Sequence, residues 1–313
     1  MSTPILEAED LQKSYGGRRA VDGLSFAVAP GEIFGLLGPN GAGKSTTLAM
    51  LSTLFPPDAG RIVIDGVDAV REPNRVRPGL GFVPQELALY PALGARDNLA
   101  FFGRIYGLHG RALEQRVDAV LDVVGLRDRA ADPVRTFSGG MTRRLNLAAG
   151  LVHSPRILFL DEPTVGVDPQ SRNFIFDHVR RLRDEGLAIL YTSHYMEEVE
   201  RLCDRVAIVD EGRLLALDTP QALIRGQGQG LLVVGLPPSA LAPEARFADA
   251  LHAAARATVR EGLLYLEVRD LNEALLELLA LCKERNVALT SLRVLEPSLE
   301  SVFLKLTGKR LRD

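Results

Sequence analysis

The residues with the clearest potential for chemistry form one glycine-rich segment. Residues 38–45 read GPNGAGKS and match the pattern G-x-x-x-x-G-K-[ST], between an expected strand and an expected helix. Glycines let backbone N–H groups turn inward on phosphates, and the N-terminus of the following helix favours negative charge. We predict that Lys44 reaches the β- and γ-phosphates of ATP and that the Ser45 hydroxyl is a ligand of Mg²⁺.

Two acidic residues follow a short apolar run. Residues 157–160 read ILFL, which predicts a buried strand, and Asp161 and Glu162 come directly after it. Ligands gather at the C-terminal ends of strands in open α/β sheets. We therefore predict that Asp161 is a partner of Mg²⁺, directly or through water, and that Glu162 takes a proton from the attacking water.

A third segment carries a family resemblance. Residues 137–141 read FSGGM and lie ahead of the acidic strand end. They resemble the signature loop of the ATP-binding-cassette (ABC) ATPases. In that family the signature serine and glycines contact the γ-phosphate of ATP held by the opposite subunit. The resemblance implies this role for Ser138, Gly139 and Gly140.

Four single positions also match the family pattern. The resemblance implies that Gln85 senses Mg²⁺ or the lytic water and that Asp168 lies in the loop coupling the two sites of a dimer. It implies that His194 contacts the γ-phosphate and that Tyr15 stacks on adenine. The predicted catalytic residues are thus Lys44, Gln85, Glu162 and His194; the metal-site residues are Ser45, Gln85 and Asp161; and the nucleotide-binding residues are Tyr15, Gly38, Pro39, Asn40, Gly41, Ala42, Gly43, Lys44, Ser45, Thr46, Ser138, Gly139, Gly140 and Asp168.

Alternating strands and helices must position these residues. Such alternation is typical of a largely parallel sheet with helices packed on it. We expect an α/β fold, a P-loop NTPase core of the ABC ATPase type, with N-terminal antiparallel strands and a helical insert over about 86–150. The predicted strands are 5–15, 19–28, 32–37, 62–65, 80–83, 157–160, 188–192 and 205–210, and the predicted helices are 96–106, 112–124, 170–185, 196–203 and one beginning at Lys44.

A glycine-rich stretch divides the chain. Residues 220–230 read PQALIRGQGQG and suggest a flexible joint. We therefore predict a nucleotide-binding domain over 1–220, a linker over 221–230 and an accessory α+β domain over 231–313. Its predicted strands are 231–236, 263–268 and 288–294, and its predicted helices are 245–256, 271–284 and 299–306. No constellation of acids, His or Cys occurs in this last part, which predicts a dimer-supporting or regulatory role.

Composition narrows the function classes. The formal net charge is -3 in 313 residues, which gives no sign of a nucleic-acid binder. The apolar runs are much shorter than the roughly 20 residues of a spanning helix, and residues 1–10 lack the features of a signal peptide. Cys203 and Cys282 lack metal-like spacing, as expected of reduced core thiols. If the protein works at a membrane, another chain must therefore cross it, and the resemblance to ABC ATPases implies a peripheral protein at the cytoplasmic face of the cell membrane.

The details of the signature loop indicate a branch of the family. The commonest signature begins with Leu and ends with Gln, whereas this one ends with Met141 and is soon followed by Arg143 and Arg144. Together with residues 191–198 and 296–304, this resembles the ATP-binding subunits of ABC-2 type multidrug and antibiotic exporters, the daunorubicin-resistance-like branch. The resemblance implies ATP hydrolysis at two composite sites of a head-to-tail homodimer, a separate integral-membrane permease docked near residues 87–102, and efflux of a drug, antibiotic or lipid-like substrate.

Three other functions stay open from the sequence. An importer ATPase of the sugar type tends to carry a β-rich C-terminal domain, whereas this tail alternates helix and strand. A soluble ABC protein of translation or DNA repair usually has two cassettes or a long coiled-coil insert. A non-catalytic binding module is disfavoured by the presence together of Lys44, Asp161, Glu162 and His194.

Overall fold

Six strands form the sheet that carries the predicted catalytic segments. The computed structural model describes residues 3–225, 230–237, 254–260, 262–268, 270–295 and 297–308. The sheet has the order β10-β9-β3-β8-β7-β6, and β3, β6, β7, β8 and β9 run parallel. Its strands are β3 (Ile33–Leu37), β6 (Leu80–Val83), β7 (Ile157–Asp161), β8 (Ala188–Ser193), β9 (Arg205–Asp210) and β10 (Arg213–Asp218). Every residue of β3, β7 and β8 is buried, as expected of parallel strands covered on both faces.

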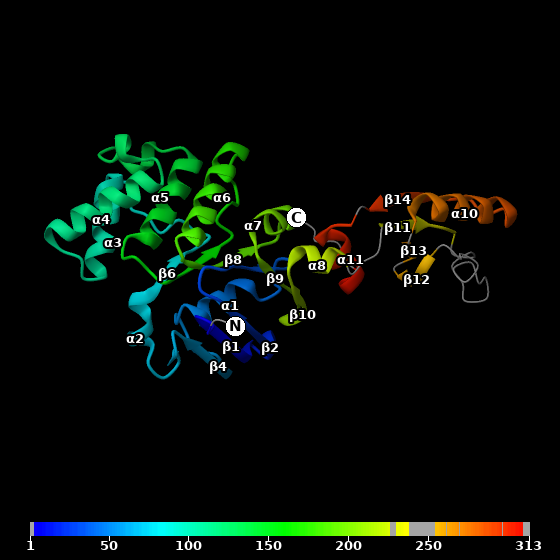
Figure 1. Cartoon of the computed structure of the whole chain (residues 1–313), viewed down its shortest axis with the longest axis horizontal. Helices are drawn as coiled ribbons and strands as arrows, with labels where there is room; N and C mark the ends of the chain where they lie inside the picture. Colours follow the sequence, from blue (N-terminus) through cyan, green and yellow to red (C-terminus); the bar gives the residue numbers. More distant parts are fainter. Residues whose placement is uncertain are drawn as a thin grey trace. The chain divides into compact units, whose positions relative to one another are not determined.

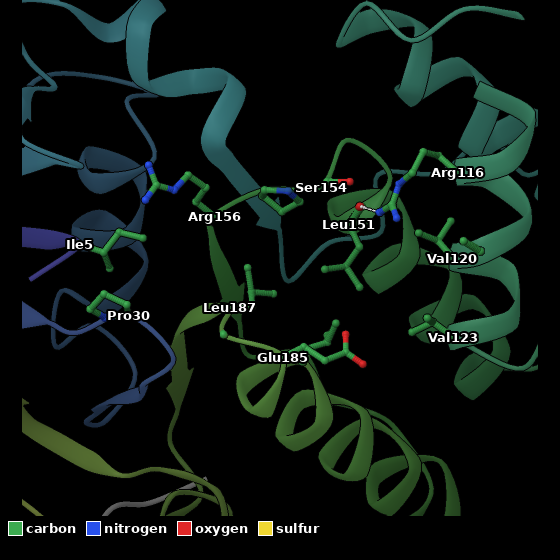
Figure 2. Close-up of a pocket in the computed structure, with 14 residues that line it drawn as sticks. Ile5, Pro30, Arg116, Val120, Val123, Leu151, Ser154, Arg156, Glu185 and Leu187 are labelled. Atoms are coloured by element: carbon green, nitrogen blue, oxygen red, sulfur yellow. Dashed lines mark hydrogen bonds between the residues drawn. The ribbon is translucent and has the colours of Figure 1, made fainter. Parts of the chain in front are cut away.

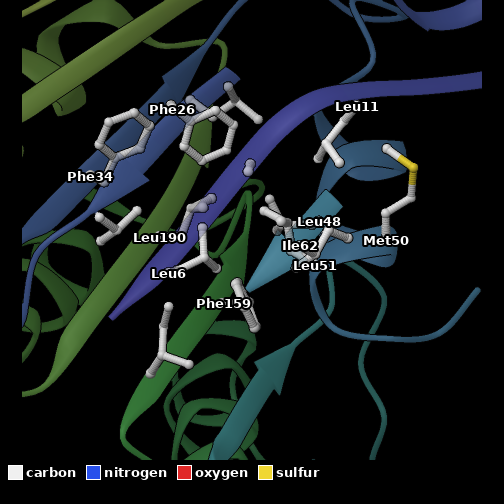
Figure 3. Packing of buried hydrophobic residues seen from close by; sticks show 14 of the residues in the cluster. Leu6, Leu11, Phe26, Phe34, Leu48, Met50, Leu51, Ile62, Phe159 and Leu190 are labelled. Carbon is white, nitrogen blue, oxygen red and sulfur yellow. The ribbon is translucent and has the colours of Figure 1, made fainter. Parts of the chain in front are cut away.

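A second, antiparallel sheet covers one face of the first. Its order is β2-β1-β4-β5, from β1 (Leu6–Tyr15), β2 (Arg18–Val28), β4 (Ala59–Ile64) and β5 (Val67–Asp68). The main core fills the space between the sheets and α1. Figure 3 shows Leu6 of β1, Phe159 of β7 and Leu48 of α1 (Lys44–Leu51) directed into it. This core fixes the phosphate loop between β3 and α1.

Helices cover the other side and form the predicted insert. Figure 1 shows α3, α4 and α5 packed together as a helical group. In α4 the residues at three- and four-residue spacing are the buried ones, such as Leu113, Val117 and Val120. The helices of this part are α3 (Ala95–Ile105), α4 (Gly110–Val123), α5 (Gly139–Leu151), α6 (Pro169–Asp184) and α7 (Met196–Leu202), with short 3₁₀ turns at Arg127–Arg129 and Val134–Thr136. The short helix α2 (Pro73–Val76) and the 3₁₀ turn Arg77–Gly79 instead follow β5 on the side of the antiparallel sheet. The predicted α/β class and its helical insert are confirmed.

Residues 1–217 and 218–313 are two compact units. The second has an antiparallel sheet of order β12-β13-β11-β14. Alternate residues of β11 face opposite ways: Leu232 joins a core with α10, and Leu231 joins one with Leu304 of α11. The elements are α8 (Pro220–Arg225), β11 (Gly230–Gly235), β12 (Ala254–Arg260), β13 (Leu263–Val268), α10 (Leu271–Glu284), β14 (Ser291–Leu295) and α11 (Leu299–Thr307).

Two predicted boundaries differ from the structure. In the predicted linker 221–230, residues 221–225 belong to α8 and Gly230 begins β11. Pro220 suits the first position of a helix, and the Thr219 hydroxyl accepts a hydrogen bond from the Ala222 amide at 3.1 Å, so α8 forms despite the glycines that follow. The predicted helix 245–256 is wrong at its end, because residues 254–256 are part of β12, where pairing with β13 overrides the helical pattern. Residues 226–229 and 245–253 lie outside the described residues.

Candidate functional site

The phosphate loop has a backbone that only glycine fits at two positions. A side chain at Gly38 would place its Cβ 2.3 Å from the carbonyl oxygen of Val209. Gly43 has φ +99°, and a Cβ there would lie 2.3 Å from the carbonyl oxygen of Ala20. Gly43 is also the N-cap of α1 and makes no side-chain cap, so the first amides of α1 remain available to an anion.

Lys44 is held inside this loop. It is the first residue of α1 and is only 4% exposed. Its Nζ donates to the carbonyl oxygens of Gly38 at 2.8 Å and Pro39 at 3.1 Å. The same Nζ lies 3.1 Å from Oε1 of Glu162, which is equally buried. The loop therefore holds a desolvated positive charge where phosphates would bind.

Asp161 and Ser45 form a pair of oxygen donors beside the loop. Asp161 Oδ1 accepts a hydrogen bond from Ser45 Oγ at 3.2 Å and from Thr192 Oγ1 at 2.7 Å. The Thr192 hydroxyl in turn accepts from the Glu162 amide at 3.0 Å. Hydroxyl and carboxylate oxygens are the ligands that Mg²⁺ prefers, so these two residues suit a magnesium ion next to phosphates.

Glu162 lies between a lysine and a histidine. Besides its contact with Lys44, its Oε2 lies 3.0 Å from Nδ1 of His194. A carboxylate oxygen accepts hydrogen bonds, so Nδ1 of His194 is the donor in this contact. Glu162 has φ +45°, a left-handed conformation that costs a non-glycine residue on the order of 1 kcal/mol or more. Surrounding contacts must therefore hold this carboxylate in place.

One open cavity of about 440 Å³ joins many of these residues. Gln85 and Tyr15 lie at its exposed rim, and the Tyr15 ring meets Phe55 edge-on at 6.4 Å between centroids. Its volume falls in the ordinary range of small-ligand sites. The lining residues are Tyr15, Arg18, Ala20, Asn40, Gly41, Gly43, Lys44, Ser45, Thr46, Gln85 and Glu162.

The signature residues and Asp168 lie elsewhere. Ser138 caps α5, its Oγ accepting from the Met141 amide at 3.3 Å, and Asp168 caps α6, accepting from the Ser171 amide at 2.9 Å. Gly140 packs so closely on α6 that a Cβ would lie 2.0 Å from Ser171 Oγ. Hydrogen bonds from Ser171 lower the pKa of Asp168, which therefore stays ionised at neutral pH. None of these residues lines the 440 Å³ cavity, so this surface is separate from it.

Three contributing residues were missed by sequence reasoning. Arg18 lines the cavity, and Thr192 bridges Asp161 and Glu162. The guanidinium of Arg143 donates to the carbonyl oxygens of Gln85 and, at 3.3 Å, of Val165. It thereby links the signature helix to two neighbouring loops. The only signal for it in the sequence is the basic pair after the signature loop.

A second cavity, of about 390 Å³, is not a candidate for the chemistry. Figure 2 shows it lined by Pro30, Arg156 and Leu187, which precede β3, β7 and β8. It therefore lies at the amino ends of the parallel strands, opposite the end where ligands gather. Its charged groups are engaged within the chain: Arg116 donates to the Leu151 carbonyl oxygen at 2.9 Å, and Arg156 pairs with Asp65.

Comparison with known proteins identifies the fold and the family. The ABC transporter family model matches residues 21–165. The whole chain is 46% identical over 315 residues to the linearmycin resistance ATP-binding protein LnrL of Bacillus subtilis (strain 168), covering 99% of this chain and 100% of that protein. The chain belongs to the ABC transporter family.

Other relatives place this ABC ATPase in the predicted branch. It is 39% identical to the daunorubicin resistance ATP-binding protein DrrA2 of Streptomyces coeruleorubidus, over 98% of this chain and 96% of that protein. A solved ATP-binding subunit of an ABC transporter matches with a TM-score of 0.64 and 29% identity, over 71% of this chain and 92% of that one. The predicted P-loop NTPase fold, the ATP-hydrolysing family and the antibiotic-exporter branch are confirmed.

Proposed function

We propose that this ABC ATPase is the ATP-hydrolysing subunit of an ABC-2 type exporter. Two composite sites of a head-to-tail homodimer would hydrolyse MgATP and drive efflux of a drug, antibiotic or lipid-like substrate. The observation that carries the proposal is the full-length similarity to drug-resistance ATP-binding proteins. A Nod factor export ATP-binding protein of Ralstonia nicotianae (strain ATCC BAA-1114 / GMI1000) is also 41% identical, over 100% of this chain and 96% of that protein.

The residues of one chain divide the work of hydrolysis. The loop amides and Lys44 bind the phosphates, and Ser45, Asp161 and Gln85 would hold Mg²⁺, which neutralises charge on the β- and γ-phosphates when bound. The γ-phosphate replaces Glu162 as the partner of Lys44, because both anions compete for one buried ammonium group 3.1 Å from the carboxylate. Glu162 is then free to accept a proton from water.

A second copy of the chain completes each site. Ser138 and Gly139 are exposed at the N-terminus of α5, where the helix dipole favours an anion. Since these residues do not line the cavity of their own chain, they are available to the γ-phosphate held by the partner. A two-fold arrangement gives two such sites and places Asp168, at the start of α6, in the same interface.

An exposed apolar surface supports docking of a membrane partner. Leu87, Tyr90 and Phe101 are each more than a third exposed, and the rings of Tyr90 and Phe101 meet edge-on at 4.9 Å. This surface begins two residues after Gln85, so a helix bound there would act on the nucleotide cavity. No helix in the described ranges has the length and hydropathy of a membrane span. We infer that the surface receives a permease helix at the cytoplasmic membrane face.

Substitution of Phe101 tests this docking. We expect Phe101→Glu to abolish recovery of the permease with the tagged chain from native membranes, because a charge replaces a 37% exposed ring. ATP hydrolysis by the isolated chain should be unchanged. Leu276→Glu is the matched control, since Leu276 is 71% exposed but lies in the second unit. Recovery of the same permease with both variants would contradict the docking surface, and recovery of ribosomes or DNA instead would contradict the exporter.

A further inference from the structure

A buried carboxylate lies close to Glu162 and His194, the candidate catalytic pair. Glu198 of α7 is 2% exposed and is not among the residues that line the nucleotide cavity. Its oxygens accept hydrogen bonds from Thr164 Oγ1 at 2.8 and 2.9 Å, from the Tyr191 hydroxyl at 2.8 Å and from Ser193 Oγ at 3.0 Å. Three hydroxyl groups from two different segments therefore converge on one side chain.

The charge of this group is compensated. Burial of an unpaired carboxylate is costly, but hydrogen bonds to the charged form offset the cost. Arg172 Nε also lies 3.5 Å from Glu198 Oε1. Burial, and then the charge of Glu198, raise the pKa of the Tyr191 hydroxyl well above its ordinary value. Tyr191 therefore remains protonated and donates to the carboxylate throughout the physiological range.

The three hydroxyls belong to the segments that carry the catalytic pair. Thr164 lies two residues after Glu162, on the loop that leaves β7, and Ser193 directly precedes His194 at the end of β8. Ser193 Oγ also accepts from the Tyr195 amide at 2.9 Å, which closes the turn around His194. Glu198 thus ties the loop after β7 to the end of β8, directly before His194.

The catalytic geometry depends on how the loop after β7 is held against the end of β8. The Glu162 carboxylate and the His194 ring are 3.0 Å apart; Glu162 directly follows β7, and His194 directly follows β8. Glu162 also has the strained φ of +45°, which persists only where its surroundings hold it. Displacements of about 1 Å in such arrangements cost on the order of a hundredfold in rate.

We propose that Glu198 is a positioning residue for ATP hydrolysis: through Thr164, Tyr191 and Ser193 it clamps the loop after β7 to the end of β8, so that Glu162 and His194 keep their relative position. This inference rests on the proposed function. It assigns Glu198 no contact with nucleotide. The effect of losing the clamp should therefore fall on turnover and leave ATP binding at the phosphate loop unchanged.

Two substitutions weaken the clamp to different degrees. Glu198→Gln keeps the size but removes the charge, and Tyr191→Phe removes one hydroxyl while keeping the buried ring. We expect each to lower kcat about tenfold or more, with the ATP dissociation constant within about twofold of the unsubstituted chain. Glu197→Gln is the control, because Glu197 neighbours Glu198 on α7 and is exposed. Kinetics and binding of a fluorescent ATP analogue separate the two quantities.

Combination with Glu162→Gln decides between positioning and a general structural role. If Glu198 acts through Glu162, Tyr191→Phe and Glu198→Gln cause no further loss in the Glu162→Gln background. An equal additional loss there, or weakened ATP binding, would overturn the inference. So would wild-type turnover in both single variants while Glu162→Gln is inactive. If instead Glu162→Gln itself hydrolyses ATP normally, the proposed role of Glu162 fails, and that outcome is separate.

Discussion

Replacement of Glu162 by glutamine will lower the rate of ATP hydrolysis by about a hundredfold or more while ATP still binds. Glutamine has nearly the same shape and can still hydrogen-bond, but its amide oxygen is too weak a base to take a proton from water. The carboxylate lies 3.1 Å from Lys44 and 3.0 Å from His194, and Glu162 is the one acid among the described residues that line the cavity.

An assay of phosphate release measures the hydrolysis rate of the Glu162→Gln chain, and a separate titration measures its ATP affinity. Glu185→Gln provides a matched control, because Glu185 is exposed and lies at the other end of the sheet, beside the second cavity. We expect the control to hydrolyse ATP at the normal rate. Wild-type turnover by the Glu162→Gln chain would show that Glu162 is not the general base. Asp161 would then be the remaining acid at the C-terminal end of β7.

Replacement of Lys44 by alanine will act on binding itself. We expect ATP affinity to fall by about a hundredfold or more, because the only buried ammonium group in the described phosphate loop is lost. The change also leaves Glu162 buried without its cation. Removal of one partner of a buried ion pair costs about 3 kcal/mol or more of folding stability, although His194 still donates to this carboxylate.

The double variant Lys44→Ala/Glu162→Gln separates these two effects. Because it removes the uncompensated carboxylate, chemical denaturation should show that part of the lost stability returns. ATP titration should show that affinity does not return. Normal ATP affinity in the Lys44→Ala chain would contradict the assignment of the loop, and no recovery of stability would mean that the pair contributes little to folding.

Local features explain why much of the site could be predicted. Glycine is required at positions 38 and 43, where a Cβ would lie 2.3 Å from a backbone carbonyl oxygen of a neighbouring segment. Both positions fall in one short stretch of the sequence. The run at 157–160 is apolar throughout because β7 is covered on both faces, which also places Asp161 at the strand end. The order and spacing of residues along the chain are sufficient to predict such features.

Features that join distant parts of the chain could not be predicted in this way. Thr164, Tyr191 and Glu198 meet only because β7 and β8 are neighbours, and none of them has a distinctive sequence pattern. The link from Arg143 to Gln85 spans 58 positions. Strand β12 forms because β13 pairs with it, whereas the helix predicted over 245–256 extends into its first three residues. Long-range pairing decides these contacts, and periodicity does not report it.

The mass of the Glu162→Gln chain in solution, with and without MgATP, tests most directly the claim that two copies complete each site. We predict that saturating MgATP doubles the mass, because bound ATP is not cleaved and the γ-phosphate joins Lys44 of one copy to Ser138 of the other. Adding Ser138→Arg should abolish the dimer while ATP still binds. A monomer at saturating MgATP would contradict the composite site.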